Sequence, residues 1–308
     1  MYDLAILGGG PAGVAAGIYA SRKKLKTVFI TDKFEGQSTV SPDIQNWIGD
    51  ISISGKDLSK KLENHLKAYS GEIVDIKENE KVISVKKNES DDVFEIKTEN
   101  ESYIAKTILV ATGSHRRKLT MEGANEFEHK GITYCASCDG PLFTNKDVIV
   151  IGGGNAGFET ASQLLAYTKS VTLLQRSDKF NADPVTVKKV TEHPNMTAIL
   201  NTETTEIKGE SFVKSLVYKD TQTGEEKEIK TDGIFVEIGN EPNTDFVEGL
   251  VELTKYKQII VDPKNQKTKT EGIWAAGDCT DALYHQNNIA VGDAVKALED
   301  IYLYLKAK

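Results

Sequence analysis

Two cysteines in the middle of the chain have a spacing that is typical of redox chemistry. Cys135 and Cys138 lie in the segment "CASCDG", and Asp139 follows them directly. A Cys-x-x-Cys arrangement lowers the pKa of one thiol, so that a thiolate is available to exchange with a disulfide. A carboxyl group beside the pair can protonate a departing thiolate. We therefore expect Cys135, Cys138 and Asp139 to be catalytic, although Asp-Gly also favours a simple turn.

A zinc site or a structural disulfide fits these cysteines less well. Zinc needs further ligands, and the rest of the chain holds only Cys279 and five histidines without a second paired spacing. Structural disulfides are rare in a reducing cytosol, and the first residues read as a strand and a glycine turn, not as a signal peptide. We expect no metal, a cytoplasmic protein, and a buried, inert thiol at Cys279.

The length of the chain allows two domains, and its charge and hydropathy argue against nucleic acid and membranes as partners. The chain of 308 residues is long enough for two compact domains. Its net charge of −8 argues against nucleic acid, because neutralising phosphates requires a surplus of Lys and Arg. No apolar run approaches the length of about 18 residues that a membrane span needs. We expect neither nucleic acid nor a membrane as a partner.

A glycine-rich turn near the N-terminus has the spacing of a dinucleotide-binding motif. An apolar strand runs into Gly8, Gly10 and Gly13, an alanine-rich helix follows, and a second strand at residues 27–31 ends at Asp32. The glycines allow a tight turn, let the backbone approach a pyrophosphate and pack the helix against the strand. The helix N-terminus adds N–H groups and a positive dipole. Asp32 is placed to accept hydrogen bonds from a ribose.

The same pattern occurs a second time, directly after the cysteine pair. Gly152, Gly154 and Gly157 repeat the spacing, but the strand that follows ends at Gln175 and Arg176 instead of an acid. An acid at this point repels a 2′-phosphate, whereas an arginine attracts one. The residues thus favour NADPH over NADH, while a plain surface role for Arg176 stays open.

Two dinucleotide motifs and a thiol pair together indicate an electron relay. A nicotinamide delivers hydride, whereas a disulfide is reduced through thiolates, and a flavin can mediate between them. One motif should therefore hold FAD and the other NAD(P)H. The residues alone leave open which motif holds which.

The motifs together resemble those of a known family, the low-molecular-weight thioredoxin reductases. The resemblance is closer to the reductase portion of alkyl hydroperoxide reductase flavoprotein subunits, and it covers essentially the whole chain. It implies an α/β fold of two Rossmann-like, three-layer (ββα) domains, with the NAD(P)H-binding domain (114–241) inserted into an FAD-binding domain (1–113 and 242–308). The motifs that carry it are "GGGPAG" (8–13), "ATG" (111–113), "CASCDG" (135–140), "GGGNAG" (152–157), "IGNEPNT" (238–244) and "GIWAAGDC" (272–279).

The resemblance also implies which residues bind the cofactors. Asp278 matches the acid that holds the ribityl chain of FAD, and Gln286 matches a residue near the pyrimidine end of its ring. The positions that match FAD contacts are Gly8, Gly10, Pro11, Ala12, Gly13, Asp32, Gly36, Gln37, Asn46, Ala111, Thr112, Gly113, Gly277, Asp278 and Gln286. The positions that match NAD(P)H contacts are Gly152, Gly154, Asn155, Ala156, Gly157, Gln175 and Arg176.

The activity that the resemblance implies is that of a thioredoxin-disulfide reductase. Electrons pass from NADPH or NADH through FAD and the Cys135–Cys138 pair to the disulfide of thioredoxin, or of a thioredoxin-like or glutaredoxin-like protein. Cys138 matches the cysteine that faces the flavin, and Cys135 the one that attacks the partner. The family is homodimeric, and its inserted domain rotates on two linkers, here "ATGSH" (111–115) and "IGNEPN" (238–243).

The chain departs from the family at the end of the second nucleotide motif. NADPH-dependent relatives carry a basic cluster where this chain has Gln175, Arg176, Ser177 and Asn181, and relatives that use NADH place an acid at the Gln175 position. The electron donor therefore stays open between NADPH, NADH, and ferredoxin or another flavoprotein. A dithiol oxidase that releases hydrogen peroxide and a non-enzymatic redox sensor are the other interpretations.

Overall fold

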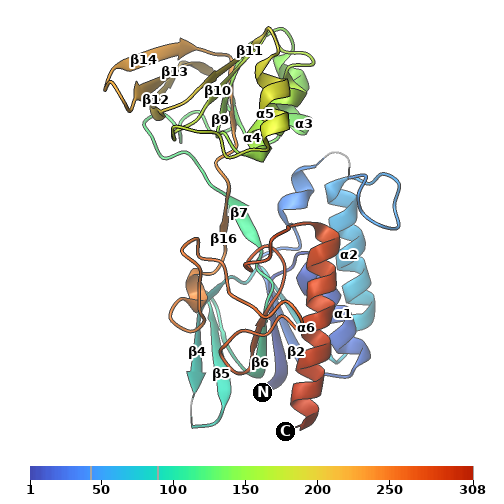
Figure 1. Ribbon diagram of the computed structural model, residues 1–308. Helices are drawn as coiled ribbons and strands as arrows, with labels where there is room; N and C mark the ends of the chain where they lie inside the picture. Colours follow the sequence, from blue (N-terminus) through green and yellow to red (C-terminus); the bar gives the residue numbers. More distant parts are fainter. Residues whose placement is uncertain (42–43, 89, 308) are drawn as a thin grey trace. The chain divides into compact units, whose positions relative to one another are not determined.

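The chain leaves one unit after residue 115 and returns to it at residue 241. Residues 1–115 and 241–308 form this discontinuous unit, and residues 116–240 form an inserted unit. The computed structural model describes residues 1–41, 44–88 and 90–307 (Figure 1).

The inserted unit begins two residues later than expected and ends one residue earlier. Hydrogen bonds to the discontinuous unit explain the later start. The side-chain amide of Gln37 donates to Ser114 O at 2.8 Å and to Ser114 Oγ at 2.7 Å, and His115 Nδ1 lies 2.6 Å from Asn243 Oδ1. The two connecting segments pair with each other as short strands, β7 (Ser114–Arg116) and β16 (Asn240–Pro242).

A seven-stranded sheet forms the centre of the discontinuous unit. Parallel strands run in the order β3-β2-β1-β6, and β17 adds a further parallel strand beside β6. β2 is buried along its whole length, which is typical of a parallel strand covered on both faces. β5 and β4 extend the sheet as an antiparallel meander. The strands are β1 (Tyr2–Leu7), β2 (Thr27–Thr31), β3 (Val74–Glu78), β4 (Val82–Asn88), β5 (Val93–Thr98), β6 (Ser102–Val110) and β17 (Ile273–Ala275).

Three helices cover one face of this sheet (Figure 1). Their apolar side chains pack with Leu4, Ile6 and Phe29 of the sheet. A second buried cluster combines the other side chains of β1, β2 and β17 with residues of β4 to β6, among them Phe94, and with the segment around Val247. The helices are α1 (Pro11–Arg22), α2 (Gly55–Ser70) and α6 (Asn287–Ala307), with 3-10 turns η1 (Gln37–Val40) and η3 (Asp245–Val247).

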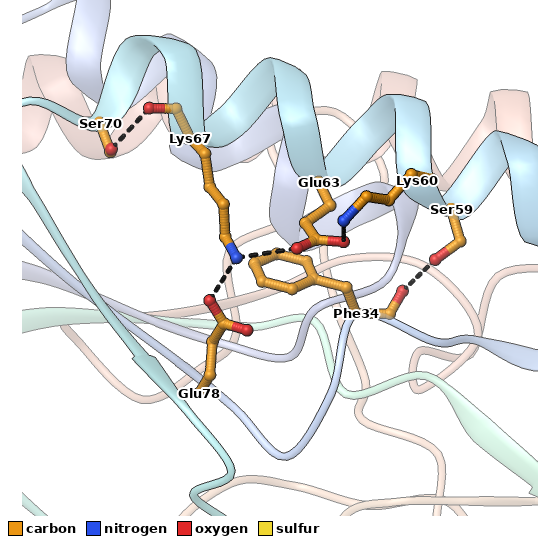
Figure 2. A network of polar contacts seen from close by, with 7 residues as sticks. All are labelled: Phe34, Ser59, Lys60, Glu63, Lys67, Ser70 and Glu78. Carbon is orange, nitrogen blue, oxygen red and sulfur yellow. Dashed lines mark hydrogen bonds and ion pairs between the residues drawn. The ribbon is translucent and has the colours of Figure 1, made fainter.

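Figure 2 shows a polar network that joins α2 to β3 and to the loop after β2. Lys67 Nζ lies 2.5 Å from Glu78 Oε1 on β3 and 2.8 Å from Glu63 Oε1 on its own helix. The same ammonium lies 5.4 Å from the centre of the Phe34 ring, and Ser59 Oγ donates to Phe34 O at 2.7 Å. These contacts tie α2 to β3 and to Phe34, which precedes the predicted FAD contacts Gly36 and Gln37, but exposed ion pairs of this kind add little stability.

The inserted unit has its own five-stranded parallel sheet, in the order β11-β10-β9-β15-β8. One face packs against α4, with Phe158 and Phe235 in the core. The other face packs against a three-stranded antiparallel sheet through Ile149, Ile207 and Leu216. The elements are β8 (Ile132–Thr133), β9 (Asp147–Ile151), α4 (Asn155–Leu164), β10 (Ser170–Leu174), α5 (Pro184–Thr191), β11 (Met196–Ile199), β12 (Thr202–Gly209), β13 (Val213–Asp220), β14 (Glu226–Lys230) and β15 (Gly233–Val236).

Both units thus combine a parallel sheet, a helical layer and further strands. The expected fold class, α/β with two Rossmann-like three-layer domains and one inserted into the other, is confirmed. Within the described ranges, no helix has the length and apolar character needed to cross a lipid bilayer.

Phe158 offers a test of whether the inserted unit has a separate core. Its side chain is fully buried and meets the Phe180 ring edge-on, with 5.0 Å between the ring centres. We expect Phe158→Ala to lower the free energy of unfolding of the inserted unit by about 3–5 kcal/mol, because it leaves a cavity. Urea unfolding should show an early transition for this unit alone.

Phe212→Ala is the matched control, because this ring is 59% exposed on the same unit. It should change the free energy of unfolding by no more than about 0.5 kcal/mol. A single early transition of the whole chain in Phe158→Ala would contradict separate cores.

Candidate functional site

The cysteine segment lies where β8 ends in the inserted unit. A four-residue helix, α3 (Ala136–Asp139), follows the strand, and a 3-10 turn, η2 (Gly140–Phe143), follows the helix. Cys135 is half-buried and disulfide-bonded. The side chain of Cys138 lies outside the described residues. The Asp139 N–H donates to Cys135 O at 3.0 Å, so one turn joins the cysteine to the acid.

A buried hydroxyl holds Asp139 beside this turn. Thr133 Oγ1 donates a hydrogen bond to Asp139 Oδ2 and accepts one from the Cys135 N–H at 3.4 Å. Thr133 itself is fixed by the sheet, where it pairs with Phe235 of β15. The carboxyl group is therefore oriented by a residue that the motifs did not single out. A threonine two positions before the first cysteine was the only available signal.

A tyrosine supports the same segment from its other side. Tyr167 Oη donates to Ala136 O at 3.4 Å. A Cβ atom at Gly140 would lie 2.1 Å from Tyr167 Oη, so only glycine leaves room for this approach. Burial raises the pKa of Tyr167, which keeps the hydroxyl protonated as a donor at neutral pH.

A cavity of about 370 Å³ opens beside Asp139. Leu142 and Phe212 line it with side chains that are 70% and 59% exposed. Lys146 and Lys214 also line it, and neither has an ion-pair partner in the part of the chain that the structure describes. Asp139 and Asp232 line it as well, so this surface, which we call the Asp139 cavity, offers apolar contact and charges of both signs next to the cysteine turn.

The first glycine turn has the geometry of a pyrophosphate cradle. Gly8 has a φ of +118°, and a Cβ there would lie 2.3 Å from Ala111 O. A Cβ at Gly13 would lie 1.9 Å from Gly8 O, whereas one at Gly10 would meet nothing within 4 Å. Gly8 and Gly13 are thus needed by the fold, while Gly10 faces open space at the start of α1. No described side chain caps this helix, so its first N–H groups are left for a ligand.

The second glycine turn repeats this geometry in the inserted unit. Gly152 has a φ of +120°, and a Cβ there would lie 2.1 Å from Glu237 O. A Cβ at Gly157 would lie 1.8 Å from Gly152 O, and one at Gly154 would meet nothing within 4 Å. No side chain among the described residues caps α4 either. Both turns therefore fit a dinucleotide.

The structure brings the predicted FAD residues to one edge of the discontinuous unit. β1, β2, β6 and β17 run parallel, so their carboxyl ends meet at the same edge of the sheet. The segments that follow these four strands hold the predicted contacts Gly8, Gly10, Pro11, Ala12, Gly13, Asp32, Gly36, Gln37, Ala111, Thr112, Gly113, Gly277 and Asp278. Asn46 and Gln286, on separate loops, are joined by a hydrogen bond of 2.9 Å between Nδ2 and Oε1.

Asp278 is a half-buried carboxyl group without a hydrogen bond to any described residue. Burial raises its pKa, and the charge of His285 opposes this shift. A half-buried carboxylate without a hydrogen bond from the protein favours a donor from a ligand, and the hydroxyl groups of a ribityl chain would supply one. This position therefore fits the predicted FAD contact.

The predicted coenzyme residues lie together at the second turn. Asn155 and Ala156 are exposed at the start of α4, and Asn155 Oδ1 accepts from the Asp183 N–H at 2.8 Å. Gln175 Oε1 accepts from the Gly153 N–H at 3.0 Å. Arg176 is exposed and has no hydrogen-bond or ion-pair partner among the described residues.

Comparison with known proteins identifies the family. A family model described as pyridine nucleotide-disulphide oxidoreductase matches residues 2–294. The chain belongs to this family. This confirms the resemblance that the six motifs predicted. The family description names a pyridine nucleotide and a disulfide, and this chain has turns that fit a nucleotide and a disulfide-bonded cysteine.

Several relatives of this oxidoreductase match over nearly its whole length. It is 39% identical over 305 residues to a Bacillus subtilis protein named NADH dehydrogenase, covering 99% of this chain and 58% of that protein. It is 40% identical over 306 residues to an alkyl hydroperoxide reductase subunit of Escherichia coli, covering 99% of this chain and 58% of the relative. The chain thus spans a little over half the length of these relatives.

Solved structures of thioredoxin reductases match this oxidoreductase from end to end. The enzyme of Lactococcus lactis superposes with a TM-score of 0.82 at 33% identity and covers 100% of both chains. The enzyme of T. acidophilum superposes with a TM-score of 0.78 at 35% identity and covers 98% of both chains.

Cys279 lies in the discontinuous unit and was not among the predicted site residues. It is a free thiol and fully buried, and its sulfur lies 3.6 Å from Val110 O. Burial raises its pKa to about 11, against the smaller effect of the Gly113 and Thr112 N–H groups on the sulfur. A thiol that stays protonated and is shielded from solvent is a poor nucleophile, as expected for a packing residue.

The two kinds of glycine in the first turn allow a paired test. We expect Gly13→Ala to destabilise the discontinuous unit by about 1–3 kcal/mol, because its Cβ meets backbone. Gly10→Ala should fold normally but bind FAD about tenfold or more weakly, because the methyl group keeps the phosphates away from the turn. Thermal unfolding and flavin release measure the two effects. Wild-type FAD affinity in Gly10→Ala would show that no phosphate approaches there.

Thr133 can be tested by removing its hydroxyl at nearly constant volume. Thr133→Val should slow disulfide reduction about tenfold and change its pH profile, because Asp139 loses a charge-assisted hydrogen bond. Thr133→Ser should restore both. Thr168→Val is the control, since Thr168 is equally buried and its hydroxyl bonds to Leu164 O at the end of α4. An unchanged pH profile in Thr133→Val would mean that the hydroxyl does not act through Asp139.

Proposed function

We propose that the protein is a flavoprotein disulfide reductase. Electrons pass from a nicotinamide coenzyme through FAD to Cys135 and Cys138, and then to the disulfide of a thioredoxin or thioredoxin-like protein. One observation carries the proposal: the cysteine turn and the Gly152 turn follow strands β8 and β9 of the same parallel sheet. Thr133 at the end of β8 donates a hydrogen bond to Asp139 beside the cysteines. Both turns follow the carboxyl ends of strands in that sheet.

The discontinuous unit is the proposed FAD site. The turn from Gly8 to Gly13 and the N-terminus of α1 would hold the pyrophosphate, Asp32 the adenosine ribose and Asp278 the ribityl hydroxyl groups. When bound, FAD would take up a hydride from the coenzyme and supply two electrons to a disulfide.

The thiols then carry out disulfide exchange. The Cys135 thiolate attacks one sulfur of the partner's disulfide, a mixed disulfide forms, and the partner's other sulfur leaves as a thiolate. The Cys138 thiolate attacks Cys135 Sγ, which re-forms the internal disulfide and releases the partner in its dithiol form. Over one cycle, a hydride and one proton convert a disulfide into two thiols. Asp139 would hold that proton next to the cysteines.

The Asp139 cavity is the proposed contact for the partner. Leu142 and Phe212 are large apolar side chains exposed beside the cysteine turn, and such clusters are typical of protein interaction sites. A small-molecule disulfide would not need them. The homodimer stays a prediction of the family resemblance, and the cytoplasmic location stays a prediction of the cysteine content and the N-terminal residues.

An anaerobic titration tests the proposal. NADH or NADPH should bleach the flavin absorbance of the purified protein, and an oxidised thioredoxin-like protein added afterwards should restore it. Bleaching by neither coenzyme would favour ferredoxin or another flavoprotein as the donor. Peroxide release with small dithiols, and no need for a protein partner, would favour the oxidase.

A cysteine variant tests the route of the electrons. Cys135→Ser should keep the bleaching by coenzyme but lose reduction of the partner by more than about 1,000-fold, since the attacking sulfur is gone. Cys279→Ala is the control and should keep most of the activity, because Cys279 is a fully buried free thiol in the core of the discontinuous unit. Undiminished activity in Cys135→Ser would exclude this route.

A further inference from the structure

The end of β10 is where the second nucleotide turn can distinguish one coenzyme from another. β10 lies beside β9, whose carboxyl end leads into the Gly152 turn. In such a fold the residue after this neighbouring strand faces the adenosine ribose. A carboxylate there accepts the 2′-hydroxyl of NADH, and an arginine nearby accommodates the 2′-phosphate of NADPH. Here the position holds Gln175, followed by Arg176.

The amide of Gln175 is bound to the protein itself. Its Oε1 accepts from the Gly153 N–H at 3.0 Å. Its Nε2 donates to Ser177 Oγ at 2.6 Å and to Lys179 O at 3.2 Å. The Asn181 N–H closes the loop by donating to Gly153 O at 2.8 Å. The side chain is therefore fixed against the glycine turn.

This arrangement leaves Gln175 with little preference for either ribose. An amide nitrogen has two N–H donors, and both are used, so none remains for a 2′-phosphate. The amide oxygen has a second lone pair, which can accept a hydrogen bond from a 2′-hydroxyl. Because the group is neutral, it neither repels a phosphate nor holds a hydroxyl as strongly as a carboxylate would.

The charged residues that follow Gln175 also discriminate little between NADH and NADPH. Arg176 and Lys179 are exposed cations without ion-pair partners among the described residues, and Asp178 lies exposed between them. An exposed ion pair changes an equilibrium by no more than about fivefold. Arg176 can therefore favour NADPH only slightly.

We infer that this site binds NADH and NADPH with dissociation constants within about tenfold of each other, and that the bound amide of Gln175 is what keeps it from selecting one. The inference rests on the proposed function, since it assumes a nicotinamide coenzyme at the Gly152 turn. If the inference holds, the protein accepts electrons from NADH as well as from NADPH.

Binding measurements test this without turnover. Isothermal titration of the FAD-loaded full chain would compare NADP⁺ with NAD⁺, and adenosine 2′,5′-bisphosphate with 5′-AMP. Members of each pair differ only by the 2′-phosphate. We expect a ratio of dissociation constants below tenfold in both pairs. A ratio above tenfold in either direction would overturn the inference and leave the proposed function standing, whereas binding of no ligand would overturn both.

Variants assign the effect to Gln175. Gln175→Glu should weaken NADP⁺ binding at least tenfold relative to NAD⁺, because a carboxylate repels the 2′-phosphate and accepts the 2′-hydroxyl. Arg176→Ala should weaken NADP⁺ binding by no more than about fivefold. Lys230→Ala, which removes an exposed charge from the antiparallel strand β14, is the control and should change neither. An unchanged ratio in Gln175→Glu would show that this residue does not face the ribose.

Discussion

Within each unit, the strands of the central parallel sheet end at the same edge, and the chemistry of the protein depends on this constraint. Residues that lie far apart in the sequence, such as Asp32, Thr112 and Asp278, follow parallel strands of one sheet. In the inserted unit, β8 leads to the cysteine turn and β9 leads to the coenzyme turn. Parallel pairing therefore brings the cysteine turn and the second glycine turn to one edge of the sheet, although the two turns are separate segments of the sequence.

Close approach of backbone to backbone requires glycine at two positions in each of the two glycine turns. The carbonyl of Gly8 lies where a side chain of Gly13 would be, and Gly152 and Gly157 repeat the contact. Helix and strand can pack this closely only at glycine, so the first helical N–H groups are held at a fixed distance from the sheet. A pyrophosphate bound there would meet N–H donors that the packing of helix against strand already positions.

Motif spacing predicted the two nucleotide turns and the family resemblance predicted the inserted fold, but neither predicted the hydrogen bonds around Asp139 and Gln175. Both nucleotide motifs, the cysteine turn and the inserted topology follow from glycine spacing, strand pattern and family resemblance. The bond from Thr133 to Asp139 could not be predicted, because it depends on the pairing of β8 with β15 across about 100 residues. The hydrogen bond from the Gly153 N–H to Gln175 Oε1 could not be predicted either, because it depends on the rotamer of the Gln175 side chain.

The two nucleotide turns differ at the residue that ends the neighbouring strand. After β2 this residue is Asp32, an exposed carboxylate that can accept both hydroxyl groups of a ribose. After β10 it is Gln175, whose amide is already bonded to Gly153 and Ser177. The turn geometry is the same, so it would allow each unit to hold a pyrophosphate but does not determine which nucleotide each unit would prefer. The preference of each turn then depends on the charge and the free hydrogen-bonding groups of Asp32 or Gln175. Gln175 is neutral and has few free hydrogen-bonding groups, so we expect the second turn to show little preference.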